Sequence, residues 1–166
     1  MNRMAGIPGL VMIALGVTWS FARAETSVYS SAAAACSLVT TAEVERAVGH
    51  RVEEKPYAYN FPTGGSSCTY ARTQVQIVVF SGAGSDQKYN SYLTSSRVTD
   101  AKKVPVSGIG RSAYFLFPNN KNTVILSVNV GGSTVGVSMV APFGTPLDTL
   151  KPKLMAMARA VAARLR

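Results

Sequence analysis

The sequence predicts an α+β fold: a mostly antiparallel sheet of about six to seven strands, covered by a long C-terminal amphipathic helix and two shorter helices. Candidate strands occur in consecutive runs, which argues against parallel βαβ units. The strongest hairpin lies over residues 123–141, where two alternating segments flank Gly131 and Gly132. Apolar residues then recur at three- and four-residue steps, which predicts a helix of about 20 residues with Thr145 as N-cap and Pro146 as first helical residue.

Residues 1–24 have the pattern of a cleavable secretory signal peptide. Arg3 supplies a positive charge, residues 7–17 (IPGLVMIALGV) form an apolar core, and Ala22 and Ala24 provide the small side chains of a cleavage site. An apolar run of about eleven residues is too short to span a bilayer. We therefore expect export to the periplasm or the extracellular space, and no transmembrane span in the mature chain.

The sequence predicts that the mature chain is one domain preceded by a short N-terminal lead segment. Residues 25–35 (ETSVYSSAAAA) are small or polar and lack periodicity, so we expect a flexible N-terminal lead there. A single α+β domain is expected over residues 36–166. A chain of this length can bury a real core without depending on cross-links.

Two cysteines, Cys36 and Cys68, occur in this domain. In an exported protein such a pair predicts a disulfide, which would stabilise the fold by about 3–4 kcal/mol by restricting the unfolded chain. Two buried free thiols are the alternative. Lipidation of Cys36 is disfavoured, because this cysteine lies well beyond the apolar core of the signal and Ala33 replaces the usual leucine three residues before it.

The two shorter helices are marked by their caps. Thr40 and Glu43 fit a capping box and Gly49 fits a C-terminal cap, which predicts a helix over residues 41–48. Ser85 can cap a second helix about ten residues long.

The strands are segments rich in β-branched and aromatic residues, separated by glycine, proline and serine clusters. Pro105 places its strand at a sheet edge, because proline cannot donate to the ladder. The predicted strands cover residues 51–61, 67–72, 74–80, 98–106, 112–117, 123–130 and 133–141.

Four short motifs in this order carry a resemblance. They are residues 36–40 (CSLVT), 48–49 (VG), 68–70 (CTY) and 106–113 (VSGIGRSA). Together they resemble a group of small secreted bacterial proteins and lipoproteins that carry a domain of unknown function, over most of residues 36–166. The resemblance implies a location in the cell envelope and an α+β fold, and it carries no catalytic residues to this chain.

Residues that could carry catalysis are few. His50 is the only histidine, and no nucleophile elbow, HExxH, SxxK or phosphate-loop motif is present. Two cysteines and one histidine do not complete a zinc shell without a carboxylate. The sequence therefore predicts no catalytic residue, metal or cofactor. Carboxylates near the histidine in sequence, which we expect to form a solvated face, are Glu43, Glu45, Glu53 and Glu54.

The chain is basic, with a formal net charge of +9. Its charge is dispersed and no recognised motif accompanies it, so nucleic-acid binding is not expected. A membrane-surface helix is an alternative for the last helix, but we favour a core helix with a solvated basic side, because the sheet needs a cover. The basic residues of this helix are Lys151, Lys153, Arg159, Arg164 and Arg166.

Aromatic residues provide the one candidate binding surface. Strand alternation places Tyr57, Tyr59 and Phe61 on one face. If exposed, this face is an interface candidate; if it faces the helices, which is the placement we favour, it is core. The sequence thus predicts a non-enzymatic binding or interaction domain for an unknown protein or envelope component. Two other functions stay open: an envelope hydrolase-like enzyme using His50 with a nearby carboxylate, and a small-ligand carrier with a pocket between sheet and helices.

Overall fold

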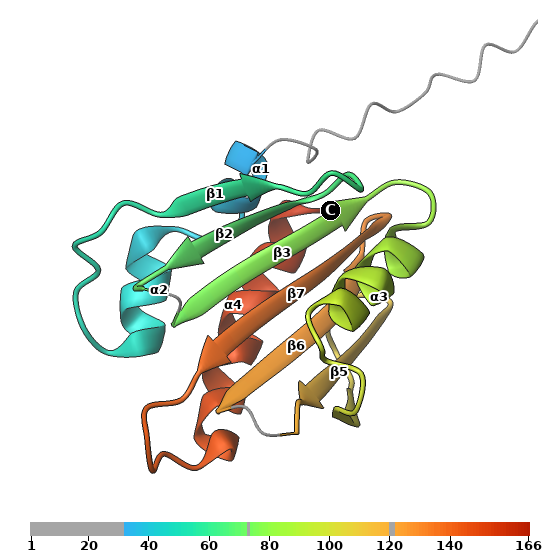
Figure 1. Ribbon diagram of the computed structural model, residues 1–166. Helices are drawn as coiled ribbons and strands as arrows, with labels where there is room; N and C mark the ends of the chain where they lie inside the picture. Colours follow the sequence, from blue (N-terminus) through green and yellow to red (C-terminus); the bar gives the residue numbers. More distant parts are fainter. Residues whose placement is uncertain (1–31, 73, 120–121) are drawn as a thin grey trace, which may run out of the picture.

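A seven-stranded antiparallel sheet organises the protein in a computed structural model that describes residues 32–72, 74–119 and 122–166 (Figure 1). The strand order is β1-β2-β3-β7-β6-β5-β4, and the predicted fold class is confirmed. The predicted signal peptide and residues 25–31 of the lead lie outside the described residues. The strands are β1 (Tyr57–Asn60), β2 (Ser66–Tyr70), β3 (Val75–Ser81), β4 (Lys102–Val106), β5 (Ser112–Phe117), β6 (Thr123–Val130) and β7 (Ser133–Val140).

Helices cover the two faces of the sheet unequally (Figure 1). One face, the α4 face, packs the larger core against α1, α2 and α4. On the opposite face, the α3 face, α3 is the one helix among the described residues. It builds a second core with β3, β5 and β6, also contacts β7, and leaves the front of β1 and β2 uncovered (Figure 1). The helices are α1 (Ala32–Ser37), α2 (Thr41–Val48), α3 (Ser85–Ser95) and α4 (Lys151–Arg164), and the 3-10 turn η2 (Leu147–Leu150) precedes α4.

The β6–β7 hairpin forms as predicted. Val130 pairs with Ser133 across the two-residue loop of Gly131 and Gly132, and both glycines have positive φ, 56° and 72°. Left-handed conformation at both loop residues gives the turn the twist of its strands. Gly131 is also constrained by packing, because a Cβ there would overlap the carbonyl oxygen of Leu165.

The first predicted helix, now α2, is confirmed together with its caps. The Thr40 side chain accepts a hydrogen bond from the Glu43 amide, and the Glu43 carboxylate accepts one from the Thr40 amide at 2.7 Å. Gly49 ends the helix in the left-handed conformation. Both ends of this short helix are therefore fixed by local side-chain and backbone bonds.

The start of the last helix differs from the prediction. A 3-10 turn occupies residues 147–150, and α4 begins only at Lys151, so neither Thr145 nor Pro146 caps it. The cause is Pro152, which has no amide hydrogen and whose ring would meet the carbonyl of Asp148 inside a continuous helix. Restarting the helix at Lys151 places Pro152 in the first turn, where proline is tolerated.

Other boundaries are also corrected, and the strand predicted over residues 98–106 begins only at Lys102. The last part of the predicted lead, residues 32–35, is helical in α1, because its alanines favour helix and Cys36 is tied to the sheet. Gly84, with φ of 74°, caps α3 in place of Ser85. The strand predicted from residue 51 begins only at β1, after Pro56, which cannot donate to a ladder.

Candidate functional site

The predicted disulfide is confirmed, and it supports the edge of the sheet beside the aromatic residues. Cys36 of α1 is bonded to Cys68 of β2, with their Cα atoms 5.0 Å apart. Close by, the hydroxyl of Tyr70 donates to the carbonyl oxygen of Val39 at 2.7 Å. Burial of this hydroxyl raises the pKa of Tyr70 to about 12, with the charge of Glu43 acting in the same direction. The link fixes α1 against β2, the strand that pairs with β1.

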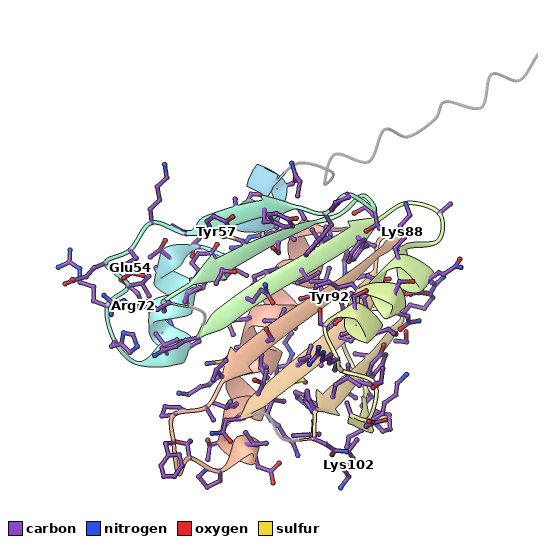
Figure 2. All side chains as sticks on the ribbon, viewed as in Figure 1. Glu54, Tyr57, Arg72, Lys88, Tyr92 and Lys102 are labelled. Atoms are coloured by element: carbon purple, nitrogen blue, oxygen red, sulfur yellow. A yellow bond between two sulfur atoms is a disulfide. The ribbon has the colours of Figure 1, made fainter. Side chains whose placement is uncertain are left out.

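Tyr57, Tyr59 and Phe61, which we call the aromatic edge, lie on or just after β1 at the outer edge of the sheet. The tyrosines are 67% and 43% exposed (Figure 2 labels Tyr57). The favoured core placement is therefore wrong for Tyr57 and Tyr59. Strand register places both side chains on the α3 face, in line with Val78 of the second core, and α3 does not extend over β1 (Figure 1).

Phe61 connects the aromatic edge to the second core. Its ring stacks on Phe80, with centroids 5.5 Å apart, and contacts Tyr92 of α3 at 5.1 Å. Tyr59 meets Phe61 edge-on at 5.4 Å. Aromatic pairs of this geometry contribute beyond the area they bury. Tyr59 is thus supported by a packed cluster of aromatic rings, and Tyr57 lies two residues before it on the same strand.

An uncharged strip of sheet continues inward from the two tyrosines. Strand register places Tyr57 opposite Thr69, Thr69 opposite Gln76, and Gln76 opposite Ser138. The hydroxyl of Tyr92 donates to the Gln76 side-chain oxygen at 3.2 Å. The strip is half-buried, so its hydroxyl and amide groups remain accessible beside the exposed rings.

The two edges of the sheet differ in how they resist pairing with another strand. β4 carries Lys102, Lys103 and Pro105, residues that disfavour strand addition. The sequence of β1, YAYN, contains no charge and no proline. The β4 edge is protected by its side chains, whereas the β1 edge is not.

Alternation of the ladder identifies the free backbone groups of β1. The amide of Phe61 donates to the carbonyl of Gly65 at 2.9 Å, which makes this a hydrogen-bonded position. Residues at two-residue steps, Tyr59 and Tyr57, then bond toward β2 as well. The residues between them, Ala58 and Asn60, direct their amide and carbonyl groups outward from the sheet.

His50 engages both of its ring nitrogens in hydrogen bonds. Its Nδ1 lies 3.1 Å from the carbonyl oxygen of Arg51, and its Nε2 lies 3.0 Å from the side-chain oxygen of Gln74. Both ring nitrogens face acceptors, an arrangement that favours the doubly protonated ring and raises the pKa of His50, the Arg51 carbonyl having the larger effect. A general base instead needs a free nitrogen lone pair aimed at its substrate.

Three of the four carboxylates near His50 in sequence are bonded to other groups of the protein. Glu53 and Glu54 line the same shallow cleft as His50, of about 240 Å³, but Glu54 accepts from the Arg72 Nε at 2.6 Å (Figure 2). Glu43 bonds to Arg164, and Glu45 accepts from the Val52 amide at 2.9 Å. The expected solvated face therefore holds in part: Glu53 and Glu54 are exposed, whereas Glu43 and Glu45 are half-buried in structural bonds.

A carboxylate in the first turn of α3 is bonded to side chains of β6 and β7. Asp86, in the first turn of α3, accepts two hydrogen bonds of 2.7 Å from the Asn129 side chain and a third from the hydroxyl of Thr134. The sequence pattern around Asp86 indicates only a loop or cap residue and does not reveal this cluster. No local signal could have found it, because the partners come from β6 and β7.

Comparisons with known proteins identify no relative of this chain. No protein-family model matches the sequence, and no curated protein and no solved structure shows significant similarity to the chain. Within residues 32–72, 74–119 and 122–166, no helix has both the length and the apolar character to cross a membrane. In those same ranges no group of three or more histidine, cysteine or acidic side chains could hold a metal ion.

Proposed function

We propose that this protein is an exported, non-enzymatic binding domain that captures an extended segment of a partner protein along β1. The observation that carries the proposal is the aromatic edge: two exposed tyrosines on an edge strand without protecting residues. The signal-peptide pattern of residues 1–24 and the Cys36–Cys68 disulfide support a periplasmic or extracellular location.

An extended peptide fits the groups that β1 offers. In strand addition, backbone hydrogen bonds provide affinity and contacts with alternate side chains provide specificity. Ala58 and Asn60 would supply the backbone bonds, and Tyr57 and Tyr59 would contact every second side chain of the ligand. Tyrosine provides a large contact area at a low cost in conformational entropy.

The length of the recognised segment is limited by two prolines. Pro56 and Pro62 lie on either side of the aromatic edge, and neither can donate a hydrogen bond to an added strand. Pairing is therefore confined to a stretch of about five residues, which is the size of a short linear motif rather than of a long strand exchange.

Selection from a displayed library of random peptides tests the proposal and needs no identified partner. Selected peptides are titrated into isotope-labelled mature protein, and amide hydrogen exchange is followed by NMR. We expect the amides of Ala58 and Asn60 to become protected. The Tyr57→Ala/Tyr59→Ala double variant should lose at least tenfold in affinity, whereas Phe143→Ala, which removes a fully exposed ring from another loop, should not.

The Ala58→Pro variant distinguishes peptide binding by strand addition from binding through the tyrosine side chains alone. This variant removes an outward amide while leaving the bonds from β1 to β2 in place. Binding should be lost although both tyrosines remain. Peptide binding that survives Ala58→Pro, or a failure to select any peptide, would overturn the proposal. The proposal would also be overturned if the mature protein alone sediments as a dimer in which a second copy covers β1.

A further inference from the structure

A groove runs between α2 and α4 on the helical side of the sheet. It encloses about 450 Å³, within the range of small-molecule sites. Its floor contains Ala47 and Met157, which are buried in the larger core. Ala156 and Ala160 form one wall. The groove exists because these side chains are short: Ala156 and Ala160 are four residues apart, on the same side of α4, where larger residues would close the space between the helices.

Two cations flank this apolar floor. Arg46 of α2 and Lys153 of α4 line the groove and are exposed. Among the described residues neither of them forms a salt bridge, since the acidic partners there are taken by other basic groups. The groove therefore combines apolar surface with uncompensated positive charge at its rim.

The carboxylate in the groove does not cancel this charge. Glu43 also lines the space, but the Arg164 guanidinium binds it with hydrogen bonds of 2.9 and 3.0 Å. This pairing, more than the capping bonds from Thr40, holds the pKa of Glu43 at about 2. The Glu43 charge is thus satisfied within the protein, and the net field at the groove is that of Arg46 and Lys153.

We propose that the α2–α4 groove binds a single-chain anionic amphiphile of the fatty-acid class. Its carboxylate would lie between Arg46 and Lys153, and its chain would lie along the alanines and Met157. Charge complementarity selects the anionic head, and the apolar floor selects the chain. Affinity should rise about two- to fourfold for each added methylene up to the length of the groove.

This site is separate from the proposed peptide site. The groove is lined by α2 and α4, which cover the α4 face of the sheet (Figure 1), whereas strand register places Tyr57 and Tyr59 on the α3 face. A variant in either site should therefore leave binding at the other unchanged, and failure of one proposal carries no consequence for the other.

The test is calorimetric titration of the mature protein with dodecanoate below its micellar concentration. We expect saturable binding of one molecule per chain, weaker binding of octanoate, and no saturable binding of dodecyltrimethylammonium, which has the same chain and the opposite charge. Filling the groove with Ala156→Leu/Ala160→Leu should reduce affinity for dodecanoate at least tenfold. Both substitutions keep a good helix former at partly exposed positions, so folding should persist.

Charge variants complete the design. Arg46→Gln/Lys153→Gln should reduce dodecanoate affinity at least fivefold, and Lys88→Gln on α3 serves as the matched control with no expected effect (Figure 2). Absence of saturable binding, equal binding of the cationic amphiphile, or an unchanged affinity in the leucine double variant would each overturn the proposal. Binding to phosphatidylglycerol vesicles without binding of dodecanoate would overturn it in favour of a membrane surface.

Discussion

Arg164, in the last turn of α4, holds the carboxylate of Glu43, in the first turn of α2, through two hydrogen bonds of 2.9 and 3.0 Å. The same guanidinium donates to the carbonyl of Leu38 at 2.6 Å. Glu43 also completes the capping box with Thr40. One carboxylate therefore joins the start of α2 to the end of α4, across 121 residues of sequence.

Glu43→Gln should destabilise the protein by about 1–2 kcal/mol, because the charge-assisted bidentate bonds to Arg164 are lost while glutamine can still complete the capping box. The value is modest because the pair is partly exposed, which weakens ion pairs. Urea unfolding followed by circular dichroism measures the change. Glu53→Gln, which removes an exposed carboxylate from a loop, is the matched control and should unfold like the wild type. Equal stability of both variants would contradict a structural role for Glu43.

The same contact predicts a dependence of stability on pH. The folded-state pKa of Glu43 is lowered from 4.5 to about 2, mainly by the Arg164 hydrogen bond. A carboxyl group with a depressed pKa contributes stability that is fully present above its unfolded value and is lost as pH falls through its folded value. The free-energy difference between wild type and Glu43→Gln should therefore be constant above about pH 5 and shrink between pH 4.5 and 2. A difference that stays constant down to pH 2 would contradict this assignment.

The disulfide gives a second stability prediction. Replacing Cys36 and Cys68 by serine should lower the free energy of unfolding by about 2–4 kcal/mol, since the cross-link restricts the unfolded chain. The effect should be largest locally, because α1 is tied to β2 by this bond. Hydrogen exchange in β1 and β2 should accelerate more than in β6 and β7. Intact-mass measurement of exported wild-type protein should show the loss of two hydrogen atoms, and finding two free thiols would contradict the bond.

Local patterns allow most elements of the fold to be predicted. The capping box of α2, the two-glycine turn after β6 and the edge position of the strand with Pro105 are each determined by residues close in sequence. The order of the strands is not predictable in this way, because the pairing of β3 with β7 joins segments that are distant in the chain. The predicted start of α4 is wrong because Pro146 has the pattern of a first helical residue, whereas Pro152 decides where the helix begins.

The candidate site is predicted only in part. Alternation places Tyr57, Tyr59 and Phe61 on one face, but whether a helix covers that face depends on the length and docking of α3. The groove between α2 and α4 has no signature in the sequence. Ala156 and Ala160 look like ordinary positions of an amphipathic helix, and their importance depends on the neighbour that α4 meets in the fold.

Gly136 provides a last prediction, in the second core. The ring and hydroxyl of Tyr89 lie directly over this glycine of β7, so an added Cβ would overlap both. Tyr89 is fully buried, and burial raises the pKa of its hydroxyl. Gly136→Ala should cost about 1–3 kcal/mol, the range typical of an overpacked core. Combining it with Tyr89→Phe should restore only part of the loss, because that change removes the overlap with the oxygen while two ring carbons remain 2.9 Å from the new Cβ. Thermal unfolding of the two single variants and the double variant measures the coupling between the two positions. Strictly additive effects on stability would contradict the idea that the nearby Tyr89 ring is the reason for glycine at position 136.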